Sequence, residues 1–193
     1  MKRNLTILLT FIIVFQSFYI YNTNAEQKKT DYGFIHTNSL RNNFEDIIII
    51  PDSNPLFGII GSYVSCWYTS QKEYGLKPMI IHKNGIFTDN HRLFFNQYFE
   101  ENDGSLLVLG KSVQIDYEKH EILGSISDVA IETATYIYSY VSTIMIISSD
   151  INEYQLSLTA SPLASYLDIP IIIYDNNTNE IENVCNELNV TEA

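Results

Sequence analysis

Five short runs of aliphatic residues constrain the fold of this chain more strongly than any other feature of its sequence. The first, over residues 47–50, consists of four isoleucines and ends at Pro51. A strand with apolar side chains on both faces is typical of a parallel sheet that is covered on both sides. Comparable runs follow at residues 79–81, 106–109, 144–147 and 171–173. The sequence therefore predicts a parallel sheet covered by helices.

The segments between these runs carry signals for helices. Asn54 followed by Pro55 predicts the start of a helix and Gly75 predicts its end, so one helix is expected over residues 56–74. Other starts are expected at Thr88 or Asp89, at Ser127 or Asp128, at residue 156, and near residue 181 with Asn177 and Glu180 as a capping pair. Alternating strands and helices predict a layered α/β fold with helices on both faces of the sheet, as in flavodoxin-like folds.

The order of these elements occurs twice. Residues 47–50, a helix and a strand led by Pro78 match residues 144–147, a second helix and a strand led by Pro170. Residue 144 stands 97 positions after residue 47, whereas Pro170 stands 92 positions after Pro78. Such offsets are typical of a divergent duplication. We expect α/β repeats over residues 46–124 and 125–193, the second either incomplete or continued in a longer chain.

The N-terminus has the pattern of an export signal. Lys2 and Arg3 precede an apolar stretch over residues 5–21, and the small residue Ala25 provides a cleavage site. We expect residues 1–25 to be removed, residues 26–45 to form a linker, and the protein to be secreted or held at the cell surface. The alternative is an uncleaved anchor, which would be the chain's only contact with a membrane.

Charge limits the partners of the chain. It has 11 basic and 23 acidic residues, a net charge of −12, and without Lys2 and Arg3 the remainder carries −14. Such a body does not attract nucleic acid through a global basic field. Residues 142–193 contain no lysine or arginine. An anionic ligand is therefore expected on the first half, with these candidate contacts: Lys77, Lys83, Arg92 and Lys111. The alternative is that these cations only form a solvated face.

Three aspartates follow the ends of predicted strands: Asp52, Asp150 and Asp175. Ligands of open α/β sheets bind at this edge, and carboxylates gathered there would hold Mg²⁺ for phosphoryl transfer. The alternative is that these residues cap helices and form turns. No phosphate-binding glycine loop accompanies them. We therefore predict no catalytic residue and no cofactor, and keep the metal-dependent enzyme as the alternative.

The remaining candidate ligands give no metal pattern. Cys66 and Cys185 are expected inside helices as buried free thiols, with a disulfide as the alternative that export permits. His82, Asp89 and His91 lie close in sequence without the spacing of a metal site. We expect these histidines to be scattered on the surface.

Several segments resemble the cell wall-binding repeat 2 family. Residues 161–173, which contain Pro162, Leu163, Ala164 and Pro170, are similar to the core sequence of that family. Residues 106–110 resemble its strand ending in glycine. Gly124 followed by Glu132, Thr133 and Ala134 resembles the start of its helix, with Ala130 and Ile131 where the family has arginine and tyrosine. The pieces keep the family's order from about Asp46 onward.

This resemblance implies a Toprim-like extracellular module that is used in tandem and binds anionic polymers of the cell envelope. We therefore expect a non-catalytic exported module for envelope attachment, whose partner is an envelope polymer or a surface protein. A structural repeat for surface assembly is the third alternative.

Overall fold

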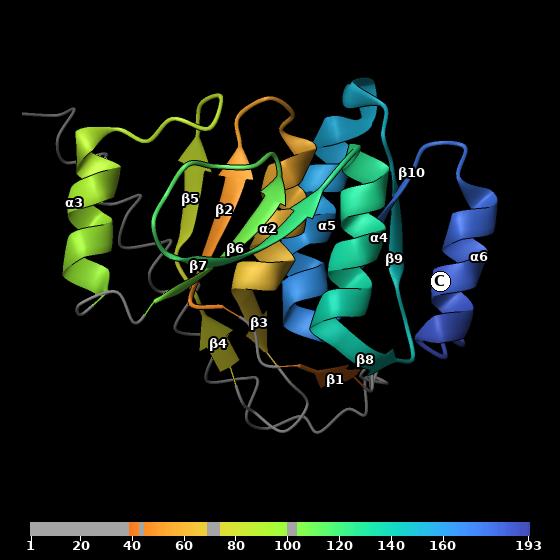
Figure 1. Cartoon of the computed structure of the whole chain (residues 1–193). Coiled ribbons are helices and arrows are strands. Elements are labelled where there is room, and N and C mark those ends of the chain that lie inside the picture. Colours follow the sequence, from red (N-terminus) through yellow and green to blue (C-terminus); the bar gives the residue numbers. More distant parts are fainter. Residues whose placement is uncertain (1–38, 43–44, 69–73, 100–103) are drawn as a thin grey trace, which may run out of the picture. The chain divides into compact units, whose positions relative to one another are not determined.

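A four-stranded parallel sheet, which contains three of the five aliphatic runs, is the centre of the computed structural model, which describes residues 39–42, 45–68, 74–99 and 104–193. Its strands are β2 (Ile47–Pro51), β5 (Met79–His82), β6 (Ser105–Gly110) and β7 (Glu118–Leu123), in the order β5-β2-β6-β7 (Figure 1). All three pairings are parallel. The layered α/β fold is thus confirmed.

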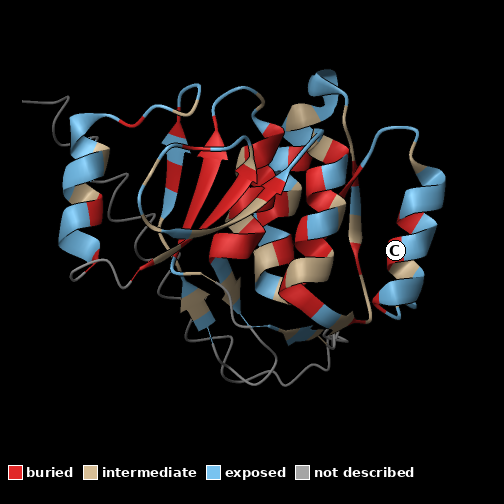
Figure 2. Ribbon diagram, viewed as in Figure 1, coloured by how far each residue is buried: buried red, intermediate tan, exposed pale blue. Residues whose placement is uncertain are grey.

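Alternate side chains of β2 serve two hydrophobic cores. Ile47 and Ile49 pack with Phe87 and Phe95 on the face covered by α3 (Asp89–Tyr98). Ile48 and Ile50 belong to the core on the other face, which is covered by α2 (Leu56–Ser65) and α4 (Ile126–Ile137). Figure 2 shows buried residues along the central strands and exposed ones along α3. The continuous isoleucine run is therefore buried on both faces, as expected.

The last two aliphatic runs form a second, separate sheet. β9 (Met145–Ser148) pairs in parallel with β10 (Ile171–Tyr174). The 3₁₀ helix η1 (Ile151–Glu153) and α5 (Tyr154–Leu167) connect these two strands, and α6 (Thr178–Glu187) follows β10. Helix α5 packs against α2 and β9, while α4 packs against β10. The parallel strands are thus divided between two sheets, which the sequence did not predict.

The two strand–helix–strand units share one register. Ile48 pairs with Met79 in the first sheet, and Met145 pairs with Ile171 in the second. The N–H of Ile48 donates to the carbonyl of Pro78 at 2.9 Å, and the N–H of Met145 donates to the carbonyl of Pro170 at 3.0 Å. These pairs preserve the sequence offsets of 97 and 92 residues.

The helix expected over residues 56–74 is wrong in its second half. Helix α2 ends at Ser65, because Cys66 adopts an extended backbone with φ −138° and ψ 124°. β3 (Cys66–Tyr68) then pairs antiparallel with β4 (Tyr74–Leu76). Gly75 lies in β4 under the ring of Trp67, where any Cβ would overlap the indole. This glycine permits a close approach and does not end a helix.

The start of the folded part also differs from the prediction. Residues 26–45 were expected to form a linker, but β1 (Ser39–Arg41) pairs antiparallel with β8 (Tyr138–Val141). The predicted export signal over residues 1–25 lies outside the described residues. Among the residues that the structure describes, no helix is long and apolar enough to cross a membrane.

The N-termini of two helices differ from the predictions. Helix α4 begins at Ser125, whose hydroxyl accepts from the N–H of Asp128, instead of at Ser127 or Asp128. Asn177 precedes α6, but its side chain accepts from the N–H of Asp175 and forms no capping pair with Glu180. By contrast, Thr88 caps α3 as expected.

The cysteine prediction is partly wrong. Cys66 and Cys185 are free thiols, but Cys66 is exposed on β3 and Cys185 is half-buried on α6. Burial raises the pKa of the Cys185 thiol, and the nearby Glu182 carboxylate adds to that rise.

Candidate functional site

The order of the four-stranded sheet marks one edge as the place for a ligand. β2 is followed along the chain by β5 on one side and later by β6 on the other. Open α/β sheets bind ligands outside the carboxyl ends of their strands, at the point where the strand order reverses. That point lies between the carboxyl ends of β2 and β6.

A tight turn brings two lysines to this edge. Lys83 and Ile86 form an antiparallel bridge around Asn84 and Gly85, whose φ angles are 53° and 80°. Positive φ at both central residues is typical of a hairpin turn with an Asn-Gly sequence. Lys111, directly after β6, donates from Nζ to the side-chain oxygen of Asn84 at 3.3 Å. Lys83 and Lys111 therefore lie near each other although 28 positions separate them in the sequence.

The His82 side chain is hydrogen-bonded to this turn. His82 is fully buried, whereas the sequence predicted a position on the surface. Its Nδ1 accepts a hydrogen bond from the N–H of Gly85 at 2.8 Å, so the proton of the neutral ring is on Nε2. Burial lowers the pKa of His82, and the Asp52 carboxylate opposes that shift. The neutral ring thus fixes the backbone turn that follows Lys83.

A polar groove lies between α3 and the connection from β6 to β7. Its volume is about 570 Å³. It is lined by Phe87, Arg92, Phe95, Asn96, Gln114, Ile115, Asp116, Tyr117 and Lys119. The Tyr117 hydroxyl donates to the side-chain oxygen of Asn96 at 3.3 Å, and its ring lies 5.9 Å from that of Phe95. Aromatic rings beside amide and guanidinium donors suit a saccharide that carries negative charge.

Arg92 and Lys119 are the cations that line the groove, and Asp116 lines it with the opposite charge. The Nζ of Lys119 lies 3.0 Å from Glu121 and 2.6 Å from the Val113 carbonyl. Arg92 is exposed and has no ion pair with any residue that the structure describes. Arg92 is therefore the cation of this groove that is best placed to bind an anion.

Lys77 does not belong to this group. It precedes β5 and lies at the opposite end of the strand from Lys83. Its Nζ donates to the carbonyl of Glu45 at 2.6 Å, and burial lowers the pKa of its amine. The structure therefore brings Lys83 and Lys111 together, leaves Arg92 in the groove beside α3, and assigns Lys77 to a contact within the fold.

The three aspartates are not brought to one point. Asp52 follows β2, whereas Asp150 and Asp175 follow β9 and β10 of the other sheet. Asp150 accepts from the N–H of Asn152 at 2.9 Å and so caps η1. Asp175 accepts from the hydroxyl of Ser149 at 3.0 Å. Among the described residues, no group of three histidine, cysteine or acidic side chains could hold a metal ion.

The residues of the predicted family pattern lie mostly in helices. Thr133 and Ala134 are buried in α4, and Glu132 on the same helix is exposed. Ala164 is buried in α5, whereas Pro162 and Leu163 of that helix are exposed. Pro170 is buried just before β10. These positions hold helices against strands.

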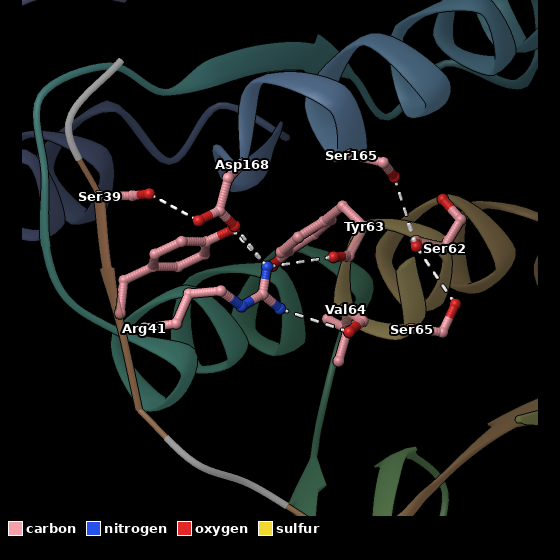
Figure 3. Close-up of polar contacts among 9 residues, drawn as sticks. Ser39, Arg41, Ser62, Tyr63, Val64, Ser65, Ser165 and Asp168 are labelled. Carbon is pink, nitrogen blue, oxygen red and sulfur yellow. Dashed lines mark hydrogen bonds and ion pairs between the residues drawn. The ribbon is translucent and has the colours of Figure 1, made fainter. Parts of the chain in front are cut away.

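A buried ion pair at the other end of the fold was missed by the sequence analysis. Arg41 of β1 donates to the Asp168 carboxylate at 2.6 Å, and the two side chains are 8% and 2% exposed (Figure 3). Asp168 also accepts from the hydroxyls of Ser39 at 2.6 Å and Tyr138 at 3.1 Å. Burial raises the pKa of the Tyr138 phenol well above its ordinary value.

The Arg41 guanidinium also closes the end of α2. It donates to the carbonyls of Tyr63 at 3.5 Å and Val64 at 3.3 Å, where the helix dipole is negative. It lies 4.3 Å from the centre of the Trp67 ring. Because strands and helices from both halves of the chain meet at this cation, the cluster holds the fold together.

The sequence contained one signal for this cluster. Asp168 lies between a helix and Pro170, at φ 52°, and aspartate tolerates this left-handed conformation better than most residues. Its partner Arg41 stands in a polar segment with no periodicity, so its role could not be predicted from the sequence.

No family profile matches the chain, and no curated protein or solved structure is significantly similar to it.

Proposed function

We propose that this chain is a non-catalytic exported module that attaches to the cell envelope by binding an anionic polymer. The observation that carries the proposal is the pair of Lys83 and Lys111 at the carboxyl edge of the four-stranded sheet, together with the exposed Arg92 in the groove beside α3. The Asn84 side chain accepts from Lys111 and Asn84 directly follows Lys83 in the chain, and α3 begins at the same end of the sheet (Figure 1).

The local charge of this face is what makes an anionic ligand reasonable for an acidic protein. The chain carries −12 overall, so long-range attraction does not bring the polymer to it. At physiological ionic strength charges are screened within about 8 Å, so contacts of a few ångströms decide binding. The groove adds aromatic and amide groups, which bind the uncharged parts of a saccharide unit.

The alternative of metal-dependent phosphoryl transfer requires an arrangement that the described residues do not form. Asp52 belongs to one sheet, and Asp150 and Asp175 belong to the other. The resemblance to cell wall-binding repeats and the face described above favour attachment instead.

Co-sedimentation of the purified full chain with isolated cell envelope tests the proposal. We expect the double variant Lys83→Gln/Arg92→Gln to bind about fivefold more weakly, from two exposed charge contacts of about 0.5 kcal/mol each. Added salt should weaken wild-type binding in the same direction.

The matched control lowers the net charge equally at another surface. Asn179 and Asn183 are exposed on α6, and Asn179→Asp/Asn183→Asp adds two negative charges without touching the cationic face. If both double variants bind equally well, the cationic face is not the polymer site. Binding that resists salt but is abolished by a chelator would assign attachment to a bridging cation instead.

A further inference from the structure

The edge of β9 is an apolar strand edge. β9 pairs with β10 on one side, and no other strand of the described chain pairs along residues 145–148 on its opposite side. The N–H groups of Met145 and Ser149 donate to carbonyls on the β10 side. Because alternate residues of a parallel strand face opposite neighbours, the N–H groups of Ile146 and Ser148 point to the open edge.

The equivalent edge in the first sheet is occupied. β2 corresponds to β9 at the offset of 97 residues, and β6 pairs with β2 on the side that β9 leaves open. Ile49, the counterpart of Ile146, is fully buried, whereas Ile146 is 41% exposed. The chain thus contains one complete and one incomplete version of the same arrangement.

Beside the open edge lies an apolar groove of about 570 Å³. It is lined by Ile146, Tyr174, Thr178, Ile181, Glu182, Cys185 and Asn186. In the first sheet, Phe87, Phe95 and side chains of β6 cover the corresponding face of β2. The groove therefore offers the apolar side chains that a further strand would cover.

The sequence of β9 also lacks the protection that exposed edges usually have. Charged side chains and prolines on edge strands oppose pairing with other chains. The edge strand β7 carries Glu118, Lys119 and Glu121. β9 has the sequence Met-Ile-Ile-Ser, with no charge and no proline. An edge of this kind is an aggregation site unless a partner covers it.

A short stretch of parallel pairing is present on this edge just before β9 starts. Thr143 forms a parallel bridge with Glu192, and the N–H of Ile144 donates to the carbonyl of Glu192 at 3.1 Å. The geometry of a parallel neighbour is therefore in place where β9 starts, and no residue that the structure describes pairs along the rest of the edge, where a segment could continue in the same direction.

We infer that the open edge of β9 binds an extended aliphatic segment of another polypeptide as an added parallel strand. The segment has the chemistry of β6, with alternate aliphatic side chains that cover Ile146 and fill the groove beside α6. Main-chain hydrogen bonds to Ile146 and Ser148 supply affinity, and the groove selects side chains. This interaction is independent of the proposed polymer site.

The probe is a fluorescent peptide with the sequence of β6, Ser-Leu-Leu-Val-Leu-Gly, extended by lysines for solubility. We expect saturable binding to the full chain by fluorescence anisotropy, and slower hydrogen exchange at the amides of Ile146 and Ser148. A peptide of the same sequence, N-methylated at alternate residues, should not bind, because it cannot form the strand ladder.

Two variants separate backbone pairing from side-chain contact. Ile146→Pro removes an N–H that points away from β10, so the β9–β10 ladder is kept, and it should weaken peptide binding about tenfold or more. Ile146→Ala keeps that N–H and should weaken binding less. Circular dichroism and the urea midpoint establish that both variants fold.

Absence of binding, equal binding of the N-methylated peptide, or unchanged exchange at Ile146 and Ser148 would overturn the inference. Light scattering measures whether the chain forms a dimer and provides a further test. A dimer of the wild-type chain that is lost in Ile146→Pro would assign this edge to a second copy of the protein and contradict the proposed partner.

Discussion

Replacing Arg41 by methionine measures what the buried ion pair contributes to folding. Methionine keeps much of the side-chain volume beneath Trp67 but leaves the Asp168 carboxylate, which is 2% exposed, without its cation. Removing one partner of a buried pair typically costs about 3–5 kcal/mol. For a domain of this size that loss corresponds to a fall in Tm of about 6–20 °C.

Urea unfolding followed by circular dichroism gives the free energy directly, provided that the slope with denaturant stays constant. The double variant Arg41→Met/Asp168→Asn is the informative comparison. Asparagine removes the buried charge, tolerates the left-handed backbone at residue 168, and its single side-chain oxygen still accepts from one of the two hydroxyls, Ser39 or Tyr138, which bond to different oxygens of Asp168. We therefore expect the second substitution to recover about 1–3 kcal/mol of the loss.

The half-exposed pair of Lys119 and Glu121 is the matched control, with side chains 26% and 25% exposed. Lys119→Met should cost no more than about 1 kcal/mol, as surface pairs do. The reasoning is refuted if Arg41→Met costs as little as this control, or if Asp168→Asn worsens the loss instead of reducing it.

Three further substitutions probe packing, backbone and protonation. Ala164→Leu inserts a larger side chain where Ala164 is fully buried, and should cost about 1–3 kcal/mol in urea unfolding; an unchanged midpoint would contradict that burial. Gly110→Ala should lower Tm, because Gly110 has φ 80° and an added Cβ would overlap the Phe57 ring, whereas Gly58→Ala, in open space within α2, should not. Because the pKa of His82 is lower in the folded state, its contribution to stability is present above about pH 6.5 and is lost as pH falls below that value. Wild type should therefore lose more stability than His82→Gln between about pH 7.5 and about pH 5.5, and parallel losses would exclude His82 as the cause.

The strands that could be predicted are those whose apolar composition indicates that they are buried. The isoleucines of β2 and the isoleucine run of β10 have one physical explanation, burial on both faces. β7 pairs with β6 over six residues, yet its sequence Glu-Lys-His-Glu resembles an exposed loop, because an edge strand needs few apolar residues. The sequence also did not show which strands pair with each other, so the division of the parallel strands between two sheets could not be predicted.

The cations of the candidate site show the same limit. Their presence in the first half of the chain was visible in the sequence, but their position depends on which end of a strand each one occupies. Lys77 and Lys83 are six positions apart and lie at opposite ends of β5. The contact between Lys111 and Asn84 depends on strand order, which local sequence does not encode.

The pairing of Arg41 with Asp168 also determines when the fold can be completed. The two residues are 127 positions apart, whereas Ile48 and Met79, which pair between β2 and β5, are 31 positions apart, and Met145 and Ile171, which pair between β9 and β10, are 26 positions apart. Contacts between distant residues require the closure of a long loop and form late. As the chain emerges during synthesis, the strand that pairs with β1 and the carboxylate that pairs with Arg41 exist only after β8 and Asp168 have been made. The first residues of the fold therefore complete their contacts late, and a chaperone that binds exposed N-terminal segments would have a long opportunity there.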